Sequence, residues 1–101
     1  MLIDIHVHLN LGGLTEDDIV ARIERGLTDV VCVSALEGGY YPTPDDVRMS
    51  NDLVHRLRRR LPRHVVGFAY VNPAHGDVAL AELRRCVEEF GFRGVKLWVA
   101  T

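Results

Sequence analysis

Three side chains that can bind a cation or move a proton recur at every second position near the start of the sequence: Asp4, His6 and His8. In a β-strand, residues two apart point to the same face, so these three would share one face, with the apolar residues from Ile3 to Leu9 on the other. Neutral imidazole nitrogen is a common ligand of Zn²⁺, and a carboxylate often holds the ring of such a histidine. The spacing favours a divalent-metal site on His6 and His8 with Asp4 in the second shell of ligands. Structural histidines without a metal are the alternative.

The segments around this motif alternate between strand and helix patterns. Strands are expected at residues 2–9, 29–34, 64–71 and 94–99. Helices are expected between them, with N-caps at Thr15, Thr43 and Asp77 and ends near Gly26, Pro62 and Gly91. The nearly continuous apolar run at 29–34 is typical of a strand covered on both faces. Alternation of this kind predicts parallel strands joined by right-handed crossovers, and therefore an α/β protein.

The length of the chain, 101 residues, limits how much of such a fold it contains. A closed eight-stranded barrel takes about 250 residues, so four strands and three helices correspond to about its first half. We therefore expect residues 1–101 to form the N-terminal half of a larger (β/α)8 TIM barrel. A small, complete doubly wound domain is the alternative.

Composition excludes several classes of protein. Twelve basic against fourteen acidic residues leave a formal charge of −2, which argues against nucleic-acid or anionic-membrane partners. No apolar run approaches the roughly 20 residues of a membrane-spanning helix, and none follows a basic start as in a signal peptide. Cys32 and Cys86 lie far apart and lack metal-site spacing, which is typical of buried thiols in a reducing cytoplasm. A cytoplasmic location is therefore predicted.

Two segments carry a resemblance to a known family: LIDIHVHLN near the start and VNPAHGDVALAELRRCVEEFGFRGVKLW at 71–98. Together with their separation they resemble the amidohydrolase superfamily, most closely its branch of metal-dependent hydrolases and aromatic-acid decarboxylases. The resemblance implies that His6 and His8 end the first barrel strand and bind a divalent metal, with Zn²⁺ expected first and Mn²⁺ as an alternative. It also implies further histidines and an aspartate on later strands. The sequence departs from the family where Trp98-Val99 replaces a frequent His-Pro, and no catalytic base of the family maps onto this chain.

Other residues are secondary candidates. Lys96 is expected to share a strand face with Trp98, either beside the metal or with its ammonium paired to a carboxylate such as that of Asp4; carboxylation of Lys96 to bridge two metals, known in the superfamily, is a weaker hypothesis. His75 follows the third strand at the end where a barrel has its active site, so a substrate contact is a further hypothesis. The loop residues Tyr40 and Tyr41 either shape a substrate pocket or are simply exposed. The remaining histidines, His55 and His64, are expected on the solvated surface.

The sequence therefore predicts a metal-dependent hydrolase of the amidohydrolase type, acting on a small-molecule amide, ester or lactone through metal-activated water. Residues 1–101 alone are expected to bind metal weakly and to be inactive. Non-oxidative decarboxylation of an aromatic or unsaturated acid is the alternative within the family. A non-catalytic α/β module and a homodimer of two half barrels also stay open. A phosphoesterase of the PHP type, which likewise begins with DxHxH, is a weaker alternative.

Overall fold

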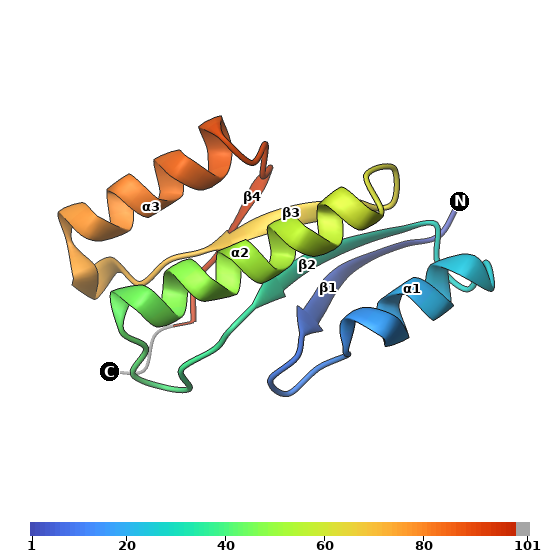
Figure 1. The fold of residues 1–101 in the computed structure, drawn as a ribbon, viewed down its shortest axis with the longest axis horizontal. Coiled ribbons are helices and arrows are strands. Elements are labelled where there is room, and N and C mark those ends of the chain that lie inside the picture. The colour runs from blue at the N-terminus through green and yellow to red at the C-terminus, as the bar shows by residue number, and fades with distance from the viewer. Residues whose placement is uncertain (99–101) are drawn as a thin grey trace.

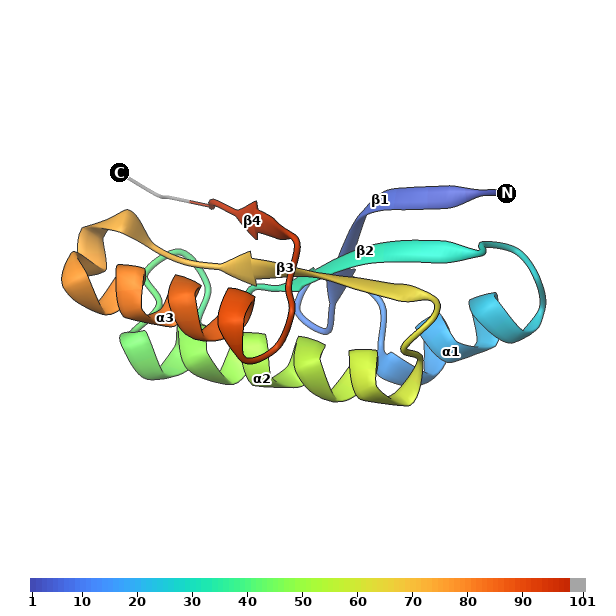
Figure 2. The ribbon, with the colours of Figure 1, turned by 90° about the horizontal axis from the view of Figure 1, so that it is seen from above.

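A computed structural model describes residues 1–98, which form a four-stranded parallel sheet with helices packed on one side (Figures 1 and 2). The strands are β1 (Ile3–Leu9), β2 (Val30–Ala35), β3 (Val65–Tyr70) and β4 (Gly94–Lys96). The helices are α1 (Glu16–Glu24), α2 (Pro44–Arg60), α3 (Asp77–Glu88) and a short 3-10 helix, η1 (Pro73–His75). Neighbouring strands follow one another in the order β1-β2-β3-β4 and every pair is parallel. The predicted α/β class and alternation are confirmed.

Two of the three α-helices begin as the sequence predicts. Thr15 caps α1 and Thr43 caps α2, and in each a reciprocal capping box forms with the aspartate three residues later. The prediction that Asp77 caps the third helix is wrong, because the N-cap is Gly76 and Asp77 is already helical. Gly76 has a φ of 60°, which glycine adopts without strain, and it turns the chain from η1 directly into α3.

The helices α1, α2 and α3 cover the same face of the sheet, as Figure 2 shows. On this face Val33, Val54 and Leu57 are completely buried. The other face is open in residues 1–98: Ile5 is 71% exposed, and Cys32 is half-buried. The strand predicted at 29–34 was expected to be covered on both faces, but within the described part of the chain only one of its faces is covered. Within residues 1–98, no helix has both the length and the apolar character needed to cross a bilayer.

The first strand departs from regular alternation. Its register against β2 shifts between Asp4 and Val7. After the shift, Val7 and Leu9 are buried under the helices, with 6% and 1% exposure, whereas Ile5 before it is 71% exposed. The prediction that all the apolar residues of this strand share one face is wrong, because the irregularity rotates the strand partway along its length.

Two glycines let the last strand lie close to β3, because each of them faces a phenyl ring of the neighbouring segment. A Cβ on Gly94 would lie 2.5 Å from the ring of Phe68, and a Cβ on Gly67 would meet the ring of Phe92. These two glycines therefore let the rings lie directly on the neighbouring strand. Phe68 pairs with Gly94 in register, and Tyr70 pairs with Lys96, so this strand pairing sets the position of Lys96. The strand ends at Lys96 rather than at the predicted residue 99, which lies outside the described residues.

Candidate metal centre at the end of the sheet

His6 and His8 lie side by side on the first strand. Their Nε2 atoms are 3.1 Å apart, and their ring centroids are 4.7 Å apart with the edge of one ring toward the other. His8 pairs with Ser34 in register and is half-buried, while His6 is exposed. Both rings face the side of the sheet that the helices leave open, since Val7 and Leu9 face the helices. Two imidazoles thus converge near the carboxyl end of β1.

His6 lies within the irregular stretch of β1. The Asp4 carboxylate accepts a hydrogen bond from the backbone N–H of His6, at 3.1 Å, within the stretch where the register shifts. This bond stabilises the local turn of the backbone from which the His6 ring projects. In the described structure, therefore, Asp4 supports the backbone of His6 rather than its ring. A second-shell contact from Asp4 to a metal-bound ring stays a prediction.

Two shallow hollows lie on the open face beside this pair of histidines. The one nearer the end of the sheet has a volume of about 330 Å³ and is lined by His6, His8, Leu11, Gly12, Leu36, Lys96 and Trp98. The second, of about 280 Å³, extends along the sheet, and its lining includes Cys32 and Phe68. His6 and Lys96 line both hollows. The structure thus brings Lys96 and Trp98 to the histidine pair.

The electrostatic environment favours a neutral His8. Burial lowers the pKa of His8 below its ordinary value, and the positive charge of Lys96 and the proximity of His6 lower the pKa further. A neutral imidazole keeps a nitrogen lone pair free, which is the state that binds a metal. The expected alternative, an ion pair between Lys96 and Asp4, is not among the ion pairs formed within residues 1–98.

The other sequence candidates lie apart from this pair. The ring Nε2 of His75 is 3.1 Å from the carbonyl oxygen of Pro42, so His75 ties η1 to the loop before α2 and lines neither hollow. Tyr40 touches the edge of the site, because its ring lies 5.1 Å from that of Trp98 while 66% of the residue is exposed. The prediction that His55 is a solvated surface residue is wrong: it is half-buried and stacks on Phe90. His64 is half-buried as well, with Nδ1 2.8 Å from the Asp29 carbonyl oxygen.

The donor set fits part of a metal site. Two nitrogens bound to one tetrahedral Zn²⁺ at about 2.0–2.1 Å lie roughly 3.3 Å apart, close to the 3.1 Å between the two Nε2 atoms. A zinc site takes four ligands, and no group of three or more histidine, cysteine or acidic side chains gathers within residues 1–98. The described residues therefore offer at most two of the four ligands that such a site needs.

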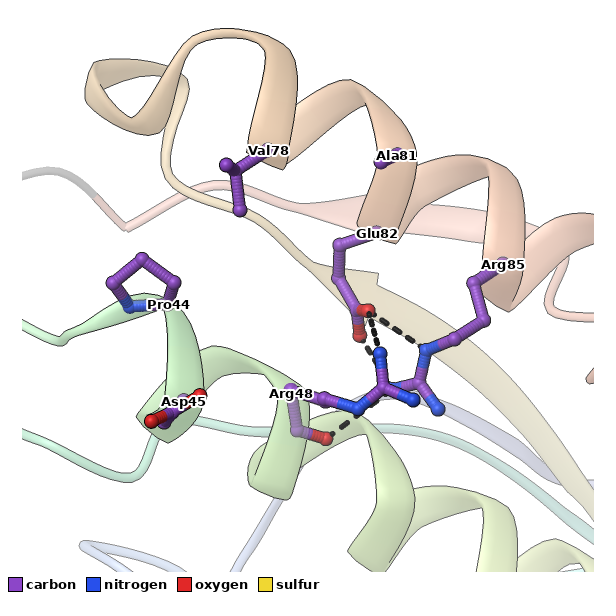
Figure 3. Close-up of a pocket in the computed structure, with 7 residues that line it drawn as sticks. All are labelled: Pro44, Asp45, Arg48, Val78, Ala81, Glu82 and Arg85. Atoms are coloured by element: carbon purple, nitrogen blue, oxygen red, sulfur yellow. Dashed lines mark hydrogen bonds and ion pairs between the residues drawn. The ribbon is translucent and has the colours of Figure 1, made fainter.

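A third hollow, of about 240 Å³, lies between α2 and α3 and is drawn in Figure 3. Its charged groups neutralise one another: Glu82 accepts hydrogen bonds at 2.7 and 2.8 Å from Arg85, and Arg48 lies 4.0 Å from the same carboxylate (Figure 3). Glu82 also accepts a hydrogen bond from Asn51. This network was not predicted from the sequence. Its signal is a polar residue among the apolar positions of each helix, Asn51 in α2 and Glu82 in α3. Because Glu82, Arg85 and Arg48 are paired with one another, we interpret this hollow as part of the contact between α2 and α3.

Fold and topology together define the first half of a (β/α)8 barrel, with the helices outside and the open sheet face corresponding to the barrel interior. Neither a family model nor a curated protein matches the sequence. Solved structures do match. A candidate amidohydrolase from Staphylococcus aureus superposes with a TM-score of 0.74 at 18% identity, over 93% of this chain and 36% of its own.

Two further structures have other activities. The 4-oxalomesaconate hydratase LigJ from Rhodopseudomonas palustris matches with a TM-score of 0.70 at 18% identity, over 94% of this chain and 40% of its own. A dihydroxybenzoic acid decarboxylase from Polaromonas, solved with manganese and the inhibitor 2-nitroresorcinol, matches with a TM-score of 0.70 at 18% identity, over 93% and 37%. The chain therefore spans less than half the length of these proteins. The predicted half-barrel fold is confirmed, and at 18% identity these matches show a likeness of fold alone.

Proposed function

We propose that this chain contributes two ligands, His6 and His8, to the divalent-metal centre of a (β/α)8 enzyme of the amidohydrolase type. The observation that carries this proposal is the 3.1 Å separation of the two Nε2 atoms on the open face, near the carboxyl end of β1. Active sites of such barrels lie at that end of the strands. Zn²⁺ is the first candidate because imidazole nitrogen suits it well. Mn²⁺ is the second, because the compared decarboxylase holds manganese.

The residues of the chain have separable roles in this proposal. His6 and His8 hold the cation through their ring nitrogens, and the lowered pKa of His8 favours the neutral form of that ring, which binds a metal. Asp4 fixes the backbone that presents His6. A bound divalent cation supplies Lewis acidity, which activates water and polarises a carbonyl or carboxylate group of the substrate. The reaction proposed first is hydrolysis of an amide, ester or lactone.

Decarboxylation of an aromatic or unsaturated acid is the second candidate reaction. A specific observation favours it: the hollow beside the histidines combines one cationic side chain, Lys96, with the apolar surface of Leu11, Leu36 and Trp98. Such a surface suits an acid with an apolar body. The compared dihydroxybenzoic acid decarboxylase gives the same candidate. Fold alone does not choose between the two reactions.

Metal binding by the full chain tests the proposal. We expect Co²⁺, followed by its visible absorption as a spectroscopic substitute for Zn²⁺, to bind with an affinity weaker than that of a complete four-ligand site. His6→Ala and His8→Ala should each abolish this binding. His64→Asn, which removes an imidazole at the opposite end of the sheet, is the matched control and should leave it unchanged. Co²⁺ binding that survives in both His6→Ala and His8→Ala would contradict the proposal.

A further inference from the structure

The loop between β1 and α1, residues 10–14, folds back onto the end of the strand that carries the two histidines. The Leu14 N–H donates a hydrogen bond to the carbonyl oxygen of His8, at 2.9 Å, and the Asn10 N–H donates one to the carbonyl oxygen of Leu14, at 2.7 Å. The Gly13 N–H donates to the Asn10 carbonyl oxygen, at 2.8 Å, and Leu14 forms a parallel bridge with Leu9. The backbone of this loop therefore holds the carboxyl end of β1.

Gly13 is the residue of the loop that packs most closely on His8. A Cβ on Gly13 would lie 2.7 Å from the carbonyl carbon of His8 and 2.8 Å from its Cβ, and closer still to its carbonyl oxygen. Carbon atoms in contact are normally about 3.5–4.0 Å apart, so the backbone of His8 leaves no room for a side chain at this position. A glycine is what allows the chain to approach the Cβ from which the His8 ring projects.

The atoms that a side chain at position 13 would displace are held by the core. Val7 and Leu9, on either side of His8, are 6% and 1% exposed, and Leu14 packs against the same core cluster. Closely packed interiors yield little to added volume. An added methyl group would therefore break the hydrogen bond from Leu14 to His8 or shift the backbone of His8, and either change alters the direction of the His8 ring.

We propose that Gly13 is a positioning residue of the candidate metal centre, because its packing fixes the backbone and Cβ of His8 and so keeps the His8 ring beside that of His6. Two ligands already held with their Nε2 atoms 3.1 Å apart need little ordering when a cation binds. The consequence for metal binding rests on the proposed function. The effect on the two rings does not, because it arises from contacts within residues 8–14.

The ring geometry of the metal-free full chain is the first test. The ring centroids of His6 and His8 are 4.7 Å apart, so NMR should show nuclear Overhauser effects between their ring protons in the wild type. Gly13→Ala should lose them. The matched control is Gly26→Ala, beyond the far end of α1. Gly26 has a φ of 70°, which strains alanine, but its Cβ position is open. This variant should lose stability and keep the ring contacts.

Co²⁺ titration is the second test. Gly13→Ala should weaken Co²⁺ binding about tenfold, as the loss of a contact that orients a metal ligand does, whereas Gly26→Ala should bind like the wild type. Chemical denaturation of both variants separates this effect from a general loss of stability. Ring contacts that persist in Gly13→Ala, or equal Co²⁺ affinities in the two variants, overturn the role of Gly13.

Two further outcomes are decided by the same samples. If His6→Ala and His8→Ala still bind Co²⁺ while Gly13→Ala alone loses the ring contacts, the metal centre fails and the positioning of His8 by Gly13 stands. If Gly13→Ala does not fold, hydrogen exchange of the wild type gives the answer. The Leu14 N–H should then exchange as slowly as the amides of β2, and exchange at the rate of an unprotected amide overturns the proposal.

Discussion

His55 shows how a single histidine can be kept neutral by its contacts. Its ring lies parallel to that of Phe90, with centroids 3.8 Å apart and an interplanar angle of 6°. Its Nδ1 atom is buried and has no hydrogen-bond partner in the described structure. Burial lowers the pKa of His55 below its ordinary value of 6.5, and the nearby charges of Arg59 and Arg58 lower the pKa further. Charging this ring therefore opposes folding.

The pH dependence of stability follows from that shift. Below about pH 6.5 the unfolded chain binds a proton on His55 more readily than the folded chain does, so the free energy of unfolding should fall as the pH falls. His55→Phe keeps a ring to stack on Phe90 but cannot titrate, so it should lose less stability than the wild type between neutral pH and about pH 5. Urea unfolding at both pH values measures this. A residual slope is expected from His8, whose pKa is also lowered. An unchanged slope in His55→Phe would contradict the role given to this residue.

At the scale of elements, α2 and α3 are joined by a buried polar network. Asn51 of α2 donates a hydrogen bond to the carbonyl of Tyr70 and accepts one from its N–H, at 2.9 and 2.8 Å. Asn51 also donates to Glu82 of α3, at 2.8 Å. Burial alone would raise the pKa of Glu82, but the hydrogen bonds from Arg85 and Asn51 outweigh it and lower the pKa. The network thus joins both helices to the end of β3.

Removing the charge of Glu82 should therefore destabilise the fold. In Glu82→Gln the Arg85 guanidinium, whose side chain is 12% exposed, loses its buried partner and keeps the more exposed Asp52 at 2.7 Å, so we expect a loss of about 2 kcal/mol. The control is Glu88→Gln on the same helix. It breaks the ion pair between Arg84 and Glu88, whose side chains are 75% and 68% exposed, respectively. That change should cost less than about 0.5 kcal/mol. Chemical denaturation compares the two, and equal losses would show that the network does not stabilise the α2–α3 contact.

The sequence predicts these elements well where a local signal exists. The capping boxes at Thr15 and Thr43 are encoded within four residues, so both helix starts are confirmed. The register shift in β1 could not be predicted, since the alternation of apolar and polar residues continues unbroken through it. The Asn51–Glu82 bond joins residues 31 apart, and only the packing of the helices brings them together. The proximity of His6 and His8 could be predicted because they lie two residues apart on one strand. The contact of Tyr40 with Trp98 could not, because it joins residues that are distant in the sequence.

At the scale of the molecule, one face of the sheet is packed and the other is open. The sheet edges in residues 1–98 are β1 and β4, and Figure 2 shows α1, α2 and α3 on the same side. Large apolar residues of these edge segments are exposed: Ile5 at 71%, Val95 at 47% and Leu97 at 56%. In a closed barrel the corresponding surface is filled by side chains of all eight strands. Whatever completes the candidate metal centre therefore has to cover this face as well.

The two cysteines report whether that face is covered. Cys86 is completely buried among the helices, and burial raises its pKa to about 12, so iodoacetamide should not modify it in the folded protein. Cys32 lines the open face and is half-buried, so it should be modified at mildly alkaline pH, more slowly than a free thiol because burial and Asp4 raise its pKa. Mass spectrometry of the digested protein gives both rates, and Cys32→Ser isolates the signal of Cys86.

If two copies of the chain pair through their open faces, Cys32 should become protected as the protein concentration rises, while a rate independent of concentration would contradict that pairing. Rapid modification of Cys86 in the native protein would contradict the packing of α3 on the sheet.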